Sequence, residues 1–115
     1  MGLAQRQIRS LDRQVAAKGQ TVRLQRIGQM NEAQFKSFRA FVRGYTPSEL
    51  AGGIEQGEST VVISPTALAA AGITGRIVSG DRLWIAGTPR TVRLCNPVST
   101  NDTVVRWEAW VKGGV

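Results

Sequence analysis

The residues best able to do chemistry are three glutamates, Glu49, Glu55 and Glu58, in a fifteen-residue segment, 45–59, that contains no lysine or arginine. Clustered carboxylates can act as an acid–base pair or can hold a hard cation. Their spacing fits neither an EF-hand calcium loop nor a pair held on one rigid element, and the segment is rich in glycine. We therefore expect no catalytic site and no metal site here.

Other reactive groups lack the partners that catalysis needs. The sequence has no histidine, so Ser10 and Ser64 have no imidazole base and there is no histidine metal ligand. The single cysteine, Cys95, excludes an intramolecular disulfide, and we expect it to be an unreactive residue of a strand. The sequence thus predicts a protein that is not an enzyme and that uses no cofactor.

The segment 45–59 is also unusual for its length, because loops this long in small domains are usually functional or disordered. Its glycines do not form a phosphate-binding loop, since no Gly-Lys-Ser/Thr sequence follows them. We expect a functional loop that projects from the domain. Its candidate residues are Glu49, Gly52, Gly53, Glu55, Gln56, Gly57 and Glu58.

The chain is strongly basic, with 15 lysines and arginines against 8 acidic residues and a net charge of +7 over 115 residues. This balance favours an anionic partner such as nucleic acid, an acidic protein surface or a membrane headgroup layer. No stretch approaches the roughly 18 apolar residues of a membrane span, so we expect no membrane partner. The length predicts one domain, which we assign to residues 20–115 behind a helical arm at 1–19.

Residues 1–19 predict a basic amphipathic helix that ends at Gly19. At about 100° per residue, the apolar and basic side chains fall on opposite sides of the helix. The apolar side consists of Ile8, Leu11 and Val15, and the basic side of Arg6, Arg9 and Arg13. Two interpretations stay open: the helix packs on its own domain, or it docks on a neighbouring subunit and turns its arginines towards an anionic surface.

The rest of the chain favours short strands. Alternating or β-branched residues predict strands at 20–27, 35–44, 60–64, 82–86, 90–95 and 103–111. The segment 35–44 also fits a helical period, but its aromatic residues favour a strand.

Details of the second half follow from turn residues and from alternation. We expect Val92 and Leu94 to point inwards, a tight reversal at 87–89, and a turn-rich connection at 96–102. Ser64 as cap, Pro65 and the following alanines predict one short helix that ends at Gly72.

These elements predict a mainly β fold: a small antiparallel barrel or sandwich of five to six strands, with an N-terminal α-helix, an alanine-rich helix and a long projecting loop. Closure into a barrel would remove open strand edges.

Two tryptophans, Trp84 and Trp110, fall on the side of their strands that faces away from the core. Large outward aromatics have three interpretations: a second apolar layer under the N-terminal helix, a subunit interface, or a surface on which bases stack. We assign both tryptophans to a subunit interface, and the other two interpretations stay open.

The order of these features resembles the small head–tail joining proteins of tailed bacteriophages, also called head-closure, stopper or neck proteins. The matching stretch runs from Phe41 to the end of the chain, and the basic N-terminal helix before the first strand also fits the family. Its most specific part is the order Gln56-Gly57-Glu58, a strand, an alanine-rich helix at 67–71, Gly80-Asp81, and a strand that ends at Gly87. Tail terminator and other tail-completion proteins have a related size and build.

The resemblance implies a ring of six or twelve copies in the virion neck, assembled in the host cytoplasm. Its partners would be the portal or adaptor ring on one side, the tail terminator or tail proteins on the other, and packaged double-stranded DNA in the channel. The segment 45–59 would line or close the channel, and a belt of its glutamates would repel the DNA. A freestanding nucleic-acid-binding barrel is the alternative from a different class.

Overall fold

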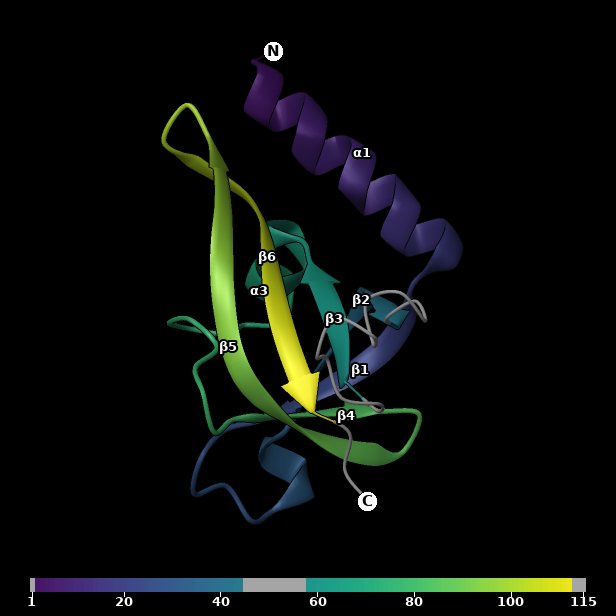
Figure 1. Ribbon diagram of the computed structural model, residues 1–115, viewed down its shortest axis with the longest axis vertical. Helices are drawn as coiled ribbons and strands as arrows, with labels where there is room; N and C mark the ends of the chain where they lie inside the picture. The colour runs from purple at the N-terminus through teal and green to yellow at the C-terminus, as the bar shows by residue number, and fades with distance from the viewer. Residues whose placement is uncertain (1, 45–57, 113–115) are drawn as a thin grey trace.

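The computed structural model describes residues 2–44 and 58–112. In these residues six antiparallel strands form a closed barrel in the order β1-β2-β3-β6-β5-β4, and β4 pairs back on β1 (Figure 1). The strands are β1 (Gln20–Gln25), β2 (Lys36–Gly44), β3 (Glu58–Ile63), β4 (Arg82–Ile85), β5 (Thr88–Thr100) and β6 (Thr103–Lys112). The helices are α1 (Leu3–Lys18), the short 3-10 helix η1 (Glu32–Gln34) and α3 (Pro65–Ala70). The predicted mainly β class and the two predicted helices are confirmed.

The core fills the inside of the barrel with side chains that alternate along each strand. Val22 and Leu24 of β1 are fully buried, as the period-2 pattern predicts. The other buried members are Phe38, Ala40, Val61, Ile63, Ile77, Leu83, Ile85, Val92, Cys95, Ala109 and Val111. Because closure pairs every strand on two sides, this alternation fixes which residues face outwards.

The ambiguous segment at 35–44 is strand β2, which confirms the preferred prediction. Ala40 faces Gln20 of β1, and Phe41 faces Val62 of β3, so the segment pairs on both edges. A helix would have left those edges open, and pairing on two sides therefore outweighs the local helical period.

Strand β5 differs from the sequence prediction in the direction of one side chain. Leu94 was expected to point inwards, but it is 36% exposed, whereas Cys95 is 4% exposed. A register irregularity against β6 between Val92 and Leu94 adds one residue and reverses the alternation after it. Burial raises the pKa of the Cys95 thiol to about 11, although nearby Arg76 opposes the shift, which fits the expected unreactive cysteine.

The two predicted turns around β5 are also shorter than expected. Residues 96–100 belong to β5 and not to a turn-rich connection, and the reversal into β6 is made by Asn101 and Asp102 at φ 50° and 64°. The earlier reversal is made by Ala86 and Gly87 at φ 52° and 80°, so Thr88 and Pro89 belong to β5. Two-residue turns with positive φ match the twist of paired strands, and this lets β5 and β6 form a long ribbon.

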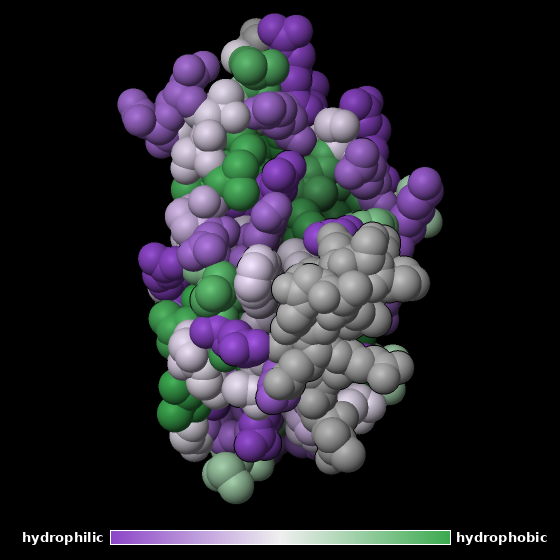
Figure 2. Space-filling model, in the orientation of Figure 1, coloured by the Kyte–Doolittle hydropathy of each residue, from purple (hydrophilic) through white to green (hydrophobic). Residues whose placement is uncertain are grey.

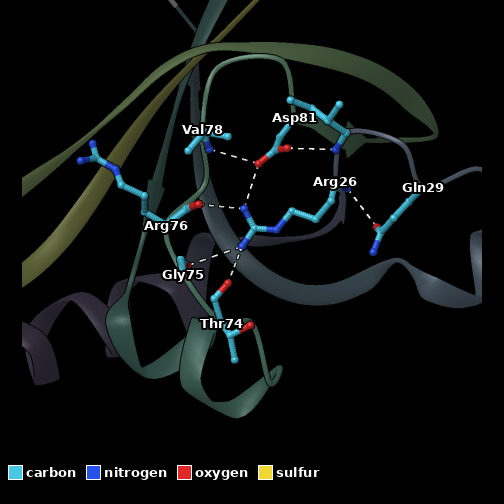
Figure 3. A network of polar contacts seen from close by, with 8 residues as sticks. Arg26, Gln29, Thr74, Gly75, Arg76, Val78 and Asp81 are labelled. Carbon is cyan, nitrogen blue, oxygen red and sulfur yellow. Dashed lines mark hydrogen bonds and ion pairs between the residues drawn. The ribbon is translucent and has the colours of Figure 1, made fainter.

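A buried carboxylate ties the end of β1 to the segment that precedes β4 (Figure 3). Asp81 is 1% exposed and accepts hydrogen bonds from the backbone N–H groups of Ile27 and Val78, both at 3.1 Å. It also accepts one from Nη1 of Arg26 at 2.9 Å. Each oxygen of the carboxylate therefore has at least one donor, which offsets the cost of burying the charge.

The guanidinium of Arg26 extends the same network to the connection between α3 and β4. It donates to the backbone carbonyl oxygens of Thr74 and Arg76, both at 2.8 Å (Figure 3). The backbone of Asp81 is also hydrogen-bonded to β5, because the Val92 N–H donates to the Asp81 carbonyl oxygen at 2.8 Å. The Asp81–Arg26 ion pair thus joins the end of β1 to the start of β4, and the backbone of Asp81 joins the same point to β5.

We expect Asp81→Asn to lower the free energy of unfolding by about 3 kcal/mol, because the new amide group faces donors and Arg26 loses its partner. Urea unfolding measures this change. Asp102→Asn is the matched control, since it removes the same charge from an exposed turn residue and should change stability by less than about 0.5 kcal/mol. Equal effects of the two variants would contradict the role of Asp81.

Candidate interaction surfaces

Helix α1 lies along one side of the barrel, against β6 and β2, with contacts to α3 and β5 (Figure 1). Ala4 and Val15 are buried, and Ile8 and Leu11 are half-buried on the same side. The interpretation that the helix packs on its own domain is therefore confirmed. Whether it also docks on a neighbouring subunit stays a prediction.

The C-terminal end of α1 is fixed to β2 by a close approach of backbone to backbone. A Cβ atom on Gly19 would lie 2.9 Å from the Ala40 carbonyl oxygen, so only glycine fits without a shift. Arg39 Nη2 donates to the Gly19 carbonyl at 2.6 Å. The predicted helix end is confirmed. Glycine is needed there because a Cβ atom has no space, and not because of an unusual backbone conformation, since the φ of Gly19 is −78°.

The middle of α1 is held by its one acidic residue. The Asp12 carboxylate accepts a short hydrogen bond from Ser64 Oγ and a second from Thr66 Oγ1 at 3.0 Å. Ser64 Oγ also accepts from Thr66 N–H at 3.2 Å and so caps α3 as predicted. Because Asp12 is used within the fold, the outward face of α1 keeps only basic charge.

That outward face consists of Arg6, Arg9 and Arg13, which are all exposed. Within residues 2–44 and 58–112 no carboxylate forms an ion pair with them. Like charges three and four residues apart on a helix destabilise it by a few tenths of a kcal/mol. An anionic partner would remove this repulsion, so the face is a candidate docking surface.

A groove lies beside α1, between the helix and the β5–β6 ribbon, and we call it the α1 groove. Its volume is about 550 Å³. Figure 2 shows apolar surface set back between polar side chains in the upper half of the view. Its apolar lining consists of Leu11, Phe41, Val62, Val98 and Val105, and its polar lining of Gln7, Ser10, Gln14, Thr100, Arg106 and Glu108.

The sequence did not predict this groove. Phe41 and Val62 lie outside the barrel, and they become neighbours only because β2 and β3 pair in the register that places one opposite the other. The apolar Phe41 on the outward parity of 35–44 was a signal that could have been followed, because an outward aromatic is usually covered.

Trp84 lies off the core parity, as predicted, and its cover differs from the predicted layer under the N-terminal helix. A subunit interface and a base-stacking surface stay predictions for this residue. Trp84 is half-buried, its ring stacks on Phe35 with centroids 6.2 Å apart, and its Nε1–H donates to Gln25 Oε1 at 2.9 Å. The Arg23 guanidinium lies 5.1 Å from the centroid of the Phe35 ring. The cover over Trp84 therefore comes from the connection between β1 and β2.

Trp110 is more open. It is 40% exposed and lies opposite Leu94 in the β5–β6 pairing, with Thr60 of β3 on its other side. An exposed tryptophan beside an exposed leucine is typical of the centre of an interface. Its predicted place in a subunit interface is not tested by the isolated chain.

The acidic segment lies largely outside the described residues. Glu49, Gly52, Gly53, Glu55, Gln56 and Gly57 all fall in the gap 45–57, and only the backbone of Glu58 is described, as the first residue of β3 opposite Lys112. The role of these residues at a DNA channel therefore stays a prediction.

In the described part of the chain, no three side chains of His, Cys, Asp or Glu come close enough to bind a metal ion. None of the helices found there has both the length and the apolar character to span a membrane. Comparison of the chain with protein-family models, curated proteins and solved structures gave no match.

We expect Asp12→Ala to loosen α1 while the barrel stays folded, because the hydroxyls of Ser64 and Thr66 lose their acceptor. Hydrogen–deuterium exchange should rise in α1 and α3 but not in β1 or β4, with a loss of about 1 kcal/mol in local stability. Gln5→Ala, an exposed change on the same helix, is the control. Unchanged exchange in α1 of the Asp12 variant would contradict this role.

Proposed function

We propose that this protein is a structural subunit of the neck of a tailed bacteriophage, where it forms a ring between the DNA-filled head and the tail. The observation that carries the proposal is the row of three exposed arginines on α1, a helix that is locked onto a closed barrel and that has no carboxylate on its outward face. Such a row is a docking surface for an acidic partner. The resemblance of the sequence to head-closure proteins supplies the identity of that partner.

The barrel suits a repeated building block. Because the barrel is closed, each strand is paired on both edges and no open edge is left for a strand of another copy. Neighbouring copies would therefore contact one another through side chains. Trp110 with Leu94 offers an apolar contact, and α1 offers a charged one. Two different surfaces on one subunit allow head-to-tail contacts, which close into a ring when the rotation permits.

In this proposal each subunit sits in a ring of six or twelve copies. The basic helix meets the portal or adaptor ring, the opposite side meets the tail terminator or tail proteins, and double-stranded DNA passes through the channel. The work is mechanical and electrostatic, and it requires no cofactor.

We expect the pair Arg9→Glu with Arg13→Glu to block attachment of the subunit to its partner ring, because each lost charge-assisted contact costs about 2 kcal/mol and the loss repeats around the ring. Electron microscopy of particles should then show heads without tails. Lys36→Glu with Arg82→Glu is the matched control, since it reverses two exposed charges on the barrel. Normal necks in the helix variant, with unchanged melting temperature, would overturn the proposal.

A freestanding nucleic-acid-binding barrel is a second candidate, favoured by the cluster in which Arg23 lies over Phe35 and Phe35 stacks on Trp84. A protein of this kind binds DNA by itself, and its affinity falls steeply with salt as counterions are released. For the neck subunit we expect weak DNA binding, with a dissociation constant above about 10 μM at physiological salt, measured by fluorescence anisotropy. Tight binding that is lost in Trp84→Ala would favour the second candidate.

A further inference from the structure

The α1 groove is a recess on the described surface, between α1 and the β5–β6 ribbon. Its floor combines Leu11 of the helix with Phe41, Val62, Val98 and Val105 of four strands. A volume of about 550 Å³ lies within the range of pockets that bind a ligand, and it accepts several side chains at once. An apolar floor of this size favours a ligand that brings apolar groups.

The rim of the α1 groove is positively charged. Arg106 lines the ribbon side, and on the helix side Arg6 and Arg13 lie within about 60° of the groove residue Ser10 around the helix axis. Arg106 is paired with the one carboxylate that lines the groove, because Oε1 of Glu108 lies 3.5 Å from its Nε, so these two residues together add no net charge. The positive charge of the rim therefore comes from the arginines of α1, and it favours carboxylates on whatever enters.

We propose that the α1 groove binds an acidic amphipathic helix of a neighbouring protein, with its apolar side chains on the floor and its carboxylates at the arginine rim. This mode follows the general rule that an amphipathic helix lays its apolar face into a groove and uses charge to set its position. The inference deepens the proposed function by naming the contact that would hold a neck partner.

A second copy of the chain fits the groove less well. Each copy carries a net charge of +7, and the exposed face of its own α1 is basic. Of the carboxylates whose side chains the structure describes, Asp12 and Asp81 are engaged inside the fold. Glu32 and Glu108 each lie within 4.0 Å of an arginine. Asp102, in an exposed turn, is the remaining one. Duplex DNA also fits less well, because it brings phosphates to the rim but no apolar side chains to the floor.

The experiment is an NMR titration of the full chain with a synthetic helical peptide whose one face is leucine and whose other face is glutamate. We expect chemical-shift changes confined to α1, Phe41, Val62 and the β5–β6 ribbon. A peptide of the same leucines with lysines in place of glutamates should bind at least tenfold more weakly. Equal binding of the two peptides, absence of binding, or shifts centred on another face would overturn the proposal.

Two variants test the floor. Val98→Asp puts a charge among the apolar residues, and Thr100→Trp fills the groove without adding charge; each should weaken binding of the glutamate peptide at least tenfold. Val78→Asp is the matched control, because Val78 is 43% exposed and is not part of the groove. Spectra of the free variants show whether they fold, and unchanged binding by the folded Thr100 variant would overturn the proposal.

A third variant tests the rim. Arg6→Gln with Arg13→Gln should weaken the glutamate peptide and reduce the salt dependence of its binding. These experiments separate the two proposals. Failure of the glutamate peptide to bind would overturn the groove proposal and leave the neck assignment unaffected, because the probe is a peptide. Normal tails on heads that carry the Arg9→Glu, Arg13→Glu variant would overturn the neck assignment and leave the groove proposal unaffected.

Discussion

Closure of the barrel by the pairing of β1 with β4 is the constraint on which the rest of this structure depends. These strands are separated by the 56 residues 26–81, so their pairing must outweigh a large loss of chain entropy. The buried ion pair of Asp81 with Arg26 lies at the end of the same two strands and joins them to the segment after α3. Once β1 and β4 are held together, the inward residues of every strand are fixed and the core closes around Leu24, Ile63 and Leu83.

Because the inside of the barrel is filled, function must lie on its outside. Helix α1 adds the main external feature, and it is attached at the end by Gly19 and in the middle by Asp12. Its one carboxylate is used for attachment, and its three arginines are exposed. This separation of charge would allow the helix to be part of the domain and also to serve as the proposed docking surface, two roles that the sequence presents as alternatives.

The long β5–β6 ribbon has a second consequence for the surface. Its two-residue turn at Asn101 and Asp102 lets the strands continue beyond the end of β3, and α1 lies alongside this extension. The α1 groove forms between them, because the helix contacts the barrel through a narrow line of side chains, chiefly Ala4 and Val15. The proposed neck subunit would therefore offer its partner a charged face and an apolar recess side by side.

The sequence by itself determined the local structure: the amphipathic α1, the cap at Ser64, the inward alternation of Val22 and Leu24, and the β class, because these depend on neighbours three or four residues away. Only the tertiary structure decided the inward turn of Cys95, the length of β5, the cover over Trp84 and the groove at Phe41 and Val62. The first two depend on the bulge and the two-residue turn of the β5–β6 hairpin, and the last two on contacts between segments that are well separated in the chain. No local residue pattern specifies either.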